Sequence, residues 1–179
     1  IEILKHIDAS SDTVLGDPAQ IQQIVMNLMR NAADSLDSER GTIEITLERA
    51  YLEPAKHTSE IKAGPYLKIA VKDTGCGMTP DIMDQIFEQY FTTKAAGKGY
   101  GMGLSVVHGI LKSHGGSIAV ESEPGKGSLF TVFLPAYDGG SVTRESDRES
   151  HTFLGESGKI LLIDDEEMIL SSVQRALEA

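Results

Sequence analysis

The sequence is short of cysteine and of positive charge, and each shortage excludes a class of protein. Its one cysteine, Cys76, has no second cysteine to pair with, so a disulfide framework cannot form and a reducing compartment fits. The 16 Lys and Arg residues are outnumbered by 27 Asp and Glu residues, and the formal net charge is -11. Because affinity for nucleic acid comes mainly from neutralising its phosphates, we expect no nucleic-acid partner. An acidic chain can still bind a nucleotide through a local loop.

Long hydrophobic runs are also missing. No segment is apolar for long enough to cross a bilayer, and the first residues, IEILKHID, alternate like a strand and do not resemble a signal peptide. We therefore expect a cytoplasmic domain, whose parent reaches a membrane only through parts outside this sequence. The 179 residues are 40% hydrophobic, which suits one full domain, or one domain and a fragment. Since the sequence does not begin with methionine, we expect a piece of a longer protein.

Glycine, in contrast, is plentiful, and it gathers in one stretch, residues 71–105. A predicted strand ends at Asp73, and Gly75 and Gly77 follow directly. Further on, glycine occupies every second position from 97 to 103. Such a run is too flexible for a helix or a strand. It suits a loop whose backbone comes close to a ligand such as a polyphosphate.

Two common phosphate-binding motifs can be excluded. The P-loop needs Gly-Lys followed by Ser or Thr, whereas Lys98 and Lys126 are each followed by glycine. The Rossmann pattern G-x-G-x-x-G fails because its third glycine would fall on Leu104 or Val106. A less common arrangement remains, in which a helix that bears amide side chains precedes the glycine-rich stretch.

Periodicity and turn residues predict a chain that mixes strands and helices. Alternating apolar residues predict strands at 1–14, 42–49, 66–73, 118–122 and 129–134. Helical spacing and cap-then-proline signals predict helices at 18–36 and 104–113, and a short one from Thr79-Pro80 with Phe87 and Phe91 at its end. On the first helix, a polar line runs one turn apart through Asn27, Asn31 and either Asp34 or Ser35. That line fits the wall of a pocket as well as a solvated face.

Four motifs occur in an order that resembles the ATP-binding domain of sensor histidine kinases. The wider superfamily also holds type II topoisomerase ATPase domains, Hsp90 chaperones and MutL repair proteins. The matching segments are GDPAQIQQIVMNLMRNAADSL (asparagine box), VKDTGCGM (first glycine box), IFEQYFTTK (phenylalanine box) and GKGYGMGLS (second glycine box), followed by the strand pair GKGSLFTVFLP. The resemblance implies a domain over residues 1–136 with an α/β (α+β) sandwich fold. Its sheet would be mixed and mainly antiparallel, with helices on one face.

The resemblance also implies that ATP and Mg²⁺ bind here. Asp73 would accept a hydrogen bond from the adenine amino group, where a guanine carbonyl would face a second acceptor. Asn27 and Asn31 would hold Mg²⁺ through side-chain oxygens, and Lys94 would lie near the outer phosphates, so these three are the implied catalytic residues. The implied nucleotide-binding residues are Asn31, Asp34, Asp73, Gly75, Gly77, Met78, Phe87, Thr93, Lys94, Gly99, Tyr100, Gly101, Met102, Gly103 and Leu104. Tyr100 and Met102 stand where the family more often has a small hydroxyl residue and leucine.

Asn27 separates two activities within the superfamily. The ATPases carry a glutamate there as general base, and an amide cannot take a proton at neutral pH. We therefore expect transfer of the γ-phosphate to a histidine on a helical hairpin upstream of this sequence, catalysed by positioning and charge neutralisation. No histidine present has a plausible setting for the acceptor: His6, His57, His108, His114 and His151. A superfamily ATPase, a protein serine kinase and a non-catalytic nucleotide-sensing module stay as alternatives.

From Ala136 the composition becomes polar and turn-rich, which predicts a linker at 137–158. Residues 159–179 predict one strand, an acidic turn and one helix, which resembles the opening of a response-regulator receiver domain. Asp164 and Asp165 match the acidic pair that holds Mg²⁺ in that family, although the phosphate-accepting aspartate is not in this sequence. The resemblance implies a hybrid two-component kinase, homodimeric in its full form, with the histidine hairpin and a receiver domain or response regulator as partners. Because a lone strand has two unpaired edges, we expect residues 159–179 to be disordered, to dock on the ATP domain or to pair with a second copy.

Overall fold

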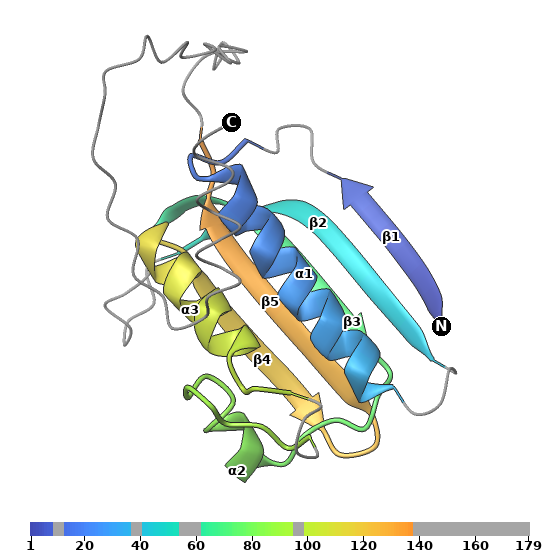
Figure 1. Ribbon diagram of the computed structural model, residues 1–179. Coiled ribbons are helices and arrows are strands. Elements are labelled where there is room, and N and C mark those ends of the chain that lie inside the picture. Colours follow the sequence, from blue (N-terminus) through green and yellow to red (C-terminus); the bar gives the residue numbers. More distant parts are fainter. Residues whose placement is uncertain (9–12, 37–40, 54–61, 95–98, 138–179) are drawn as a thin grey trace, which may run out of the picture. The chain divides into compact units, whose positions relative to one another are not determined.

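A five-stranded sheet forms the base of the domain in the computed structural model, which describes residues 1–8, 13–36, 41–53, 62–94 and 99–137. The strand order is β1-β2-β3-β5-β4 (Figure 1). The strands are β1 (Glu2–Asp8), β2 (Thr42–Leu52), β3 (Gly64–Asp73), β4 (Ser117–Glu123) and β5 (Gly127–Pro135). The helices are α1 (Pro18–Ser35), α2 (Pro80–Met83) and α3 (Gly103–Ser113).

Strand pairing in the sheet is mixed. β1 runs parallel to β2, whereas the pairs β2–β3, β3–β5 and β4–β5 are antiparallel. The two long helices, α1 and α3, lie side by side on one face of the sheet (Figure 1). The predicted sandwich, mainly antiparallel with helices on one face, is therefore confirmed.

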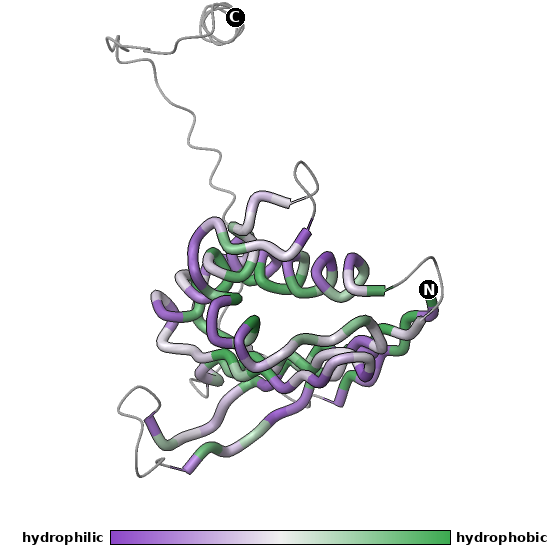
Figure 2. The backbone as a smooth tube through the Cα atoms, turned by 90° about the horizontal axis from the view of Figure 1, so that it is seen from below, coloured by the Kyte–Doolittle hydropathy of each residue, from purple (hydrophilic) through white to green (hydrophobic). Residues whose placement is uncertain are grey.

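The core lies between the helical layer and the sheet, which Figure 2 shows as two separate layers. Apolar residues at helical spacing supply the upper half, and alternate residues of β2, β3 and β5 supply the lower half. The fully buried members include Ile24, Leu28, Ile43, Val71, Val107, Leu111, Val132 and Leu134. Burial of these side chains holds the two layers together, since each contributes about 1.5–3 kcal/mol relative to exposure.

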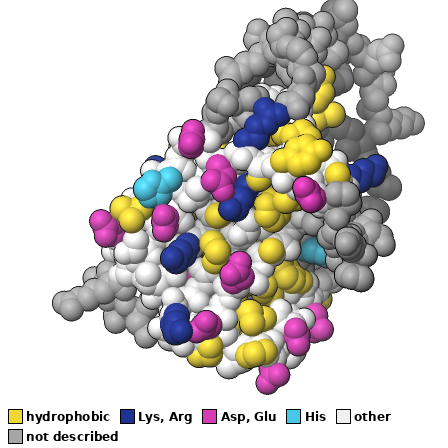
Figure 3. Space-filling model, turned by 180° about the vertical axis from the view of Figure 1, so that it is seen from behind, with side chains coloured by type: hydrophobic (Ala, Val, Ile, Leu, Met, Phe, Trp, Pro, Cys, Tyr) yellow, Lys and Arg dark blue, Asp and Glu magenta, His cyan; other side chains and the backbone are white. Residues whose placement is uncertain are grey.

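The other face of the sheet carries charged side chains of both signs among hydrophobic ones (Figure 3). Lys68 on β3 pairs with Glu48 on β2 at 2.7 Å, and His6 on β1 lies 3.4 Å from Glu44 on β2. All seven residues of β1 are exposed, so this edge strand adds little to the core. None of the helices in the described ranges combines the length and the hydropathy needed to cross a membrane.

The local signals that predicted the start of α1 and the end of α3 are confirmed. Asp17 caps α1 through its side chain, which accepts a hydrogen bond of 2.8 Å from the Ala19 N–H, and Pro18 takes the first helical position. At the end of α3 the Gly116 N–H donates to the Leu111 carbonyl at 2.8 Å, as expected for a glycine-terminated helix.

Two predicted elements need correction. The first strand ends at Asp8 instead of reaching residue 14, and Val14 forms only an isolated bridge with Ala136. The short helix ends at Met83, so Phe87 lies in the turns that follow it and Phe91 comes directly after them. Thr79 makes no side-chain cap bond, and four residues are too few for a helix to stabilise itself, so packing decides the path beyond Met83.

Two boundaries also differ from expectation. The hairpin β2–β3 is longer at its loop end than its alternating core predicted, because pairing continues to Leu52 and Gly64. The predicted linker at 137–158, apart from Tyr137, and the predicted strand and helix at 159–179 lie outside the described residues.

Candidate functional site

The carboxylate of Asp73 is the most deeply buried acidic group of the site, with 2% of the residue exposed. It ends β3, and one of its oxygens, Oδ1, accepts three hydrogen bonds. The donors are the Ser35 hydroxyl at 2.9 Å, the Gly75 N–H at 2.8 Å and the Ser128 N–H at 3.3 Å. A buried carboxylate is costly unless hydrogen bonds compensate it, and these three donors do so at a single oxygen.

The two glycines after Asp73 are required by contacts within the protein. A Cβ on Gly75 would lie 2.1 Å from the Ser35 hydroxyl oxygen, and Gly77 has a φ of 65° with a Cβ position 1.9 Å from the Glu123 carbonyl oxygen. The close neighbours of the two glycines within the protein are the end of α1, at Gly75, and the β4–β5 hairpin, at Gly77. Whether a purine also lies against them stays a prediction.

Serine hydroxyls join that hairpin to the first glycine box. Ser122 Oγ accepts from the Met78 N–H at 2.8 Å and donates to the Gly127 carbonyl at 3.0 Å. The Ser122 hydroxyl has a single proton, which it donates to Gly127. In the contact of 3.0 Å between the two serine hydroxyls, Ser128 is therefore the donor. The network runs from Met78 through two serines to Asp73, and it fixes the strand pair relative to the carboxylate.

Sequence reasoning did not find Ser122 and Ser128, and it offered Ser35 only as an alternative to Asp34. Ser122 ends a predicted strand and Ser128 lies between the predicted turn and the next strand, and neither setting predicted a site residue. Ser35 did carry a signal, because it stands one turn after Asn31 on the polar line.

Polar residues on α1 face different parts of the site. Asn27 and Asn31 are half-buried, and Asn27 Oδ1 lies 3.6 Å from the position that a Cβ on Gly103 would take at the start of α3. Asp34 instead forms an ion pair of 2.6 Å with Lys94. Because the polar line on α1 contacts both α3 and Lys94, these contacts favour the interpretation that it forms a wall of a site over the interpretation that it is a solvated face.

Lys94 lies between α1 and the glycine-rich segment. Its backbone N–H donates to Thr92 Oγ1 at 3.2 Å, and its Cδ is 3.1 Å from the Cβ position of Gly99. Thr93 is exposed beside it. Lys94 and Asp34, predicted site residues from distant parts of the chain, are therefore in contact, and residues 95–98 lie outside the described part.

The described end of the glycine-rich segment packs against the turn after α2. The Tyr90 N–H donates to the Gly101 carbonyl at 2.9 Å, and Tyr90 and Gly101 both have positive φ, 68° and 67°. Tyr100 and Met102 are exposed, at 78% and 45%. The other predicted residues here point elsewhere: Leu104 packs against the core, and the Phe87 ring lies 5.6 Å from that of His108.

Metal-ligand chemistry in this region rests on amide oxygens. The described residues contain no group of three or more His, Cys, Asp or Glu side chains that could hold a metal ion. Asn27 and Asn31 supply the neutral oxygen donors that suit Mg²⁺ when phosphates provide the remaining charge. The residues present thus fit a metal that arrives with a nucleotide. Asp164 and Asp165 lie outside the described residues.

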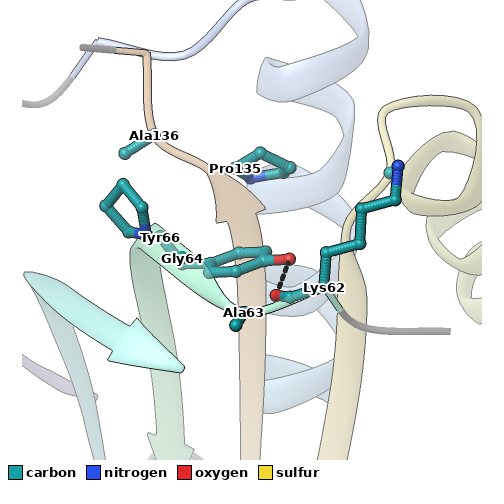
Figure 4. A pocket seen from close by; sticks show the side chains of 8 residues that line it. Lys62, Ala63, Gly64, Tyr66, Pro135 and Ala136 are labelled. Carbon is teal, nitrogen blue, oxygen red and sulfur yellow. Dashed lines mark hydrogen bonds between the residues drawn. The ribbon is translucent and has the colours of Figure 1, made fainter. Parts of the chain in front are cut away.

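A separate cavity of about 260 Å³ lies at the opposite end of β3 (Figure 4). There the Tyr66 hydroxyl donates to the Lys62 carbonyl at 2.8 Å. The lining residues are Lys62, Ala63, Gly64, Pro65, Tyr66, Gly115, Pro135 and Ala136. None of them belongs to the predicted site, so this cavity is distinct from the region around Asp73.

Comparison with known proteins places the chain in a family. A family model described as "Histidine kinase-, DNA gyrase B-, and HSP90-like ATPase" matches residues 16–138, more than half of the chain. The chain therefore belongs to this family of ATPase domains, and the resemblance read from its four motifs is confirmed at that level.

Among the individual relatives to which the chain is similar are sensor kinases. The sensor kinase CckA of Brucella abortus is 38% identical over 175 residues, which cover 93% of this chain and 18% of the relative. The sensor histidine kinase ZraS of Escherichia coli is 43% identical over 132 residues, 74% of this chain and 24% of the relative. The chain thus spans less than a quarter of either protein. Among solved structures, full-length ShkA in complex with AMPPNP is 28% identical with a TM-score of 0.54, covering 75% of this chain and 26% of that one.

Proposed function

We propose that this chain binds Mg-ATP at the Asp73 end of the sheet and donates the γ-phosphate to a histidine on a helical hairpin of its parent protein. The observation that carries the proposal is the buried Asp73 carboxylate, which three donors orient through one oxygen. No hydrogen bond to Oδ2 occurs among the described residues, so this oxygen remains available to an adenine amino group. A structural relative described as a complex with AMPPNP, an ATP analogue, supports the choice of nucleotide.

Each contact of the site has a role in this proposal. Asn27 and Asn31 hold the Mg²⁺ that accompanies the phosphates, and Lys94 exchanges Asp34 for the outer phosphates. The N–H groups of residues 99–103 and the start of α3 bind the phosphate chain, since a helix N-terminus attracts anions. Met78 and Phe87, which both pack against the hydrophobic core, complete the proposed nucleotide site.

Phosphoryl transfer, not hydrolysis, is the reaction that these residues favour. An imidazole nitrogen attacks the γ-phosphorus, a P–N bond forms, the bond to the β–γ bridging oxygen breaks, and ADP leaves. Hydrolysis needs a base for water, and Asn27 cannot accept a proton. We therefore expect slow steady-state ATP hydrolysis.

The test is a titration followed by a transfer assay. Mg-ATP binding to the full chain is measured by calorimetry, and γ-labelled ATP is then supplied with the purified histidine hairpin of the parent. We expect saturable binding, label on the hairpin, and loss of label but not of fold in Asn31→Ala. Fast hydrolysis without transfer would favour the ATPase alternative, transfer to serine the serine kinase, and binding without either reaction a nucleotide-sensing module.

We further propose that residues 159–179 begin a receiver domain, so that the parent is a hybrid kinase, homodimeric and possessing a response-regulator partner. The similarity to CckA supports an extension of homology past residue 138, because it covers 93% of this chain whereas the ATPase family match ends at that residue. Mg²⁺ binding by Asp164 and Asp165 and a cytoplasmic location belong to the same proposal. Phosphotransfer from the labelled hairpin to the complete downstream domain tests it.

A further inference from the structure

We infer that Ser35 is a positioning residue, which aligns the Asp73 carboxylate so that Oδ2 meets the adenine amino group. The inference rests on the proposed function, because it assumes that Asp73 reads the base. It assigns to the last residue of α1 a role in nucleotide specificity.

The geometry around Asp73 supports this role. A carboxylate can rotate about its Cβ–Cγ bond, and donors on one side of it restrict that rotation. All three donors contact Oδ1, and two of them are backbone N–H groups, of Gly75 and Ser128. Ser35 supplies the one side-chain donor, at 2.9 Å, which is shorter than the Ser128 contact of 3.3 Å. A substitution at Ser35 therefore removes one of the three donors that orient the Asp73 carboxylate and leaves the two backbone donors in place.

The single proton of the Ser35 hydroxyl has two acceptors within reach. Its oxygen is 2.8 Å from the Ala32 carbonyl, one turn back on α1, and 2.9 Å from Asp73 Oδ1. A hydrogen bond to an ionised group is roughly twice as strong as one between neutral groups, so the carboxylate is the favoured acceptor. The last residue of α1 thereby helps to orient Asp73, instead of using its hydroxyl proton for a hydrogen bond within the helix.

The surrounding backbone keeps Ser35 in place. The Cys76 N–H donates to the Ser35 carbonyl at 3.0 Å, so the glycine box is bound to the same residue twice. Gly75 leaves the space that the hydroxyl occupies, since a Cβ there would lie 2.1 Å from Ser35 Oγ. The absence of a side chain at Gly75 thus allows the Ser35 hydroxyl to reach Asp73.

The test compares two nucleotides on two variants of the full chain. Mg-ATP and the Mg complex of purine riboside triphosphate, which lacks the 6-amino group, are titrated calorimetrically into wild type, Ser35→Ala and Ser113→Ala. Ser113 is a matched control, because it ends α3 as Ser35 ends α1 and donates to the carbonyl three residues back at 2.8 Å, but lies away from Asp73. Circular dichroism and thermal unfolding establish that each variant is folded.

We expect wild type to prefer ATP by roughly tenfold or more, as a charge-assisted hydrogen bond provides. In Ser35→Ala this preference should fall severalfold through weaker ATP binding, while affinity for the analogue stays within about twofold; Ser113→Ala should match wild type. Equal loss for both nucleotides would assign Ser35 a structural role only, and an unchanged preference would give it none, so either result overturns the inference. If wild type bound neither nucleotide, the proposed function itself would fail.

Discussion

At the scale of single residues, a substitution at Asp73 tests the proposed reading of the base, because the two oxygens of this carboxylate have different proposed partners. In Asp73→Asn the three donors at Oδ1 select the amide oxygen, which forces the amide nitrogen to the ligand side. A donor then faces the adenine amino group. We expect ATP affinity to fall by roughly 10–100-fold, measured by calorimetry, with little change in the thermal midpoint. Unchanged ATP affinity in this folded variant would contradict base reading by Asp73.

Gly77 provides a second residue-scale prediction, on stability. Its φ of 65° disfavours side chains, and a Cβ would lie 1.9 Å from the Glu123 carbonyl oxygen, which is backbone and cannot swing away. We expect Gly77→Ala to lower the free energy of unfolding by at least about 2 kcal/mol in urea titrations. Gly109 on α3 has open space around it, so Gly109→Ala should instead raise stability by about 0.5–1 kcal/mol. Similar effects of the two changes would refute the argument.

At the scale of elements, the two proline-started helices differ in how they begin. Asp17 accepts from the Ala19 N–H, whereas Thr79 has the same sequence setting and makes no side-chain cap bond. We expect Asp17→Ala to cost about 1 kcal/mol of unfolding free energy, and Thr79→Ala less than about 0.5 kcal/mol, in urea titrations. Equal costs would mean that the cap bond at Asp17 contributes nothing of its own.

The same contrast explains which elements could be predicted from the sequence. α1 combines a cap, a proline and a long apolar stripe, and its bounds were predicted to within one residue. The end of α2 was not predicted, because the aromatic residues Phe87 and Phe91 continue a helical pattern that packing interrupts. Local signals describe local hydrogen bonds, so they succeed where those bonds determine the conformation.

At the scale of the whole molecule, the site is built from segments that are far apart in the sequence. Asp73 meets Ser35, 38 residues before it, and Ser128, 55 residues after it. The pair of Lys94 and Asp34 spans 60 residues. Motif resemblance predicted the Asp73 and Lys94 regions, but not the serines, because their role depends on strand register and on where a helix ends. These contacts exist only once β3, β5 and α1 have packed together.

The core also determines where the chain can be shortened. Among the described residues, the buried core lies between Ile24 and Leu134, and the backbone stays bonded up to Tyr137, whose N–H donates to the Thr13 carbonyl at 2.9 Å. We expect a chain that ends at Tyr137 to unfold cooperatively and to bind Mg-ATP within about twofold of the full chain, by urea titration and calorimetry.

A matched truncation that ends at Val132 gives this last prediction its control. It removes Leu134, which is 1% exposed, and the cross-strand partners of Tyr66 and Leu67 on β3. Loss of one such buried leucine costs about 2–5 kcal/mol, so this shorter chain should be largely unfolded or lose cooperativity. Weak ATP binding by the folded chain that ends at Tyr137 would mean that residues beyond it complete the nucleotide site, and the domain boundary proposed at residue 136 would then be wrong.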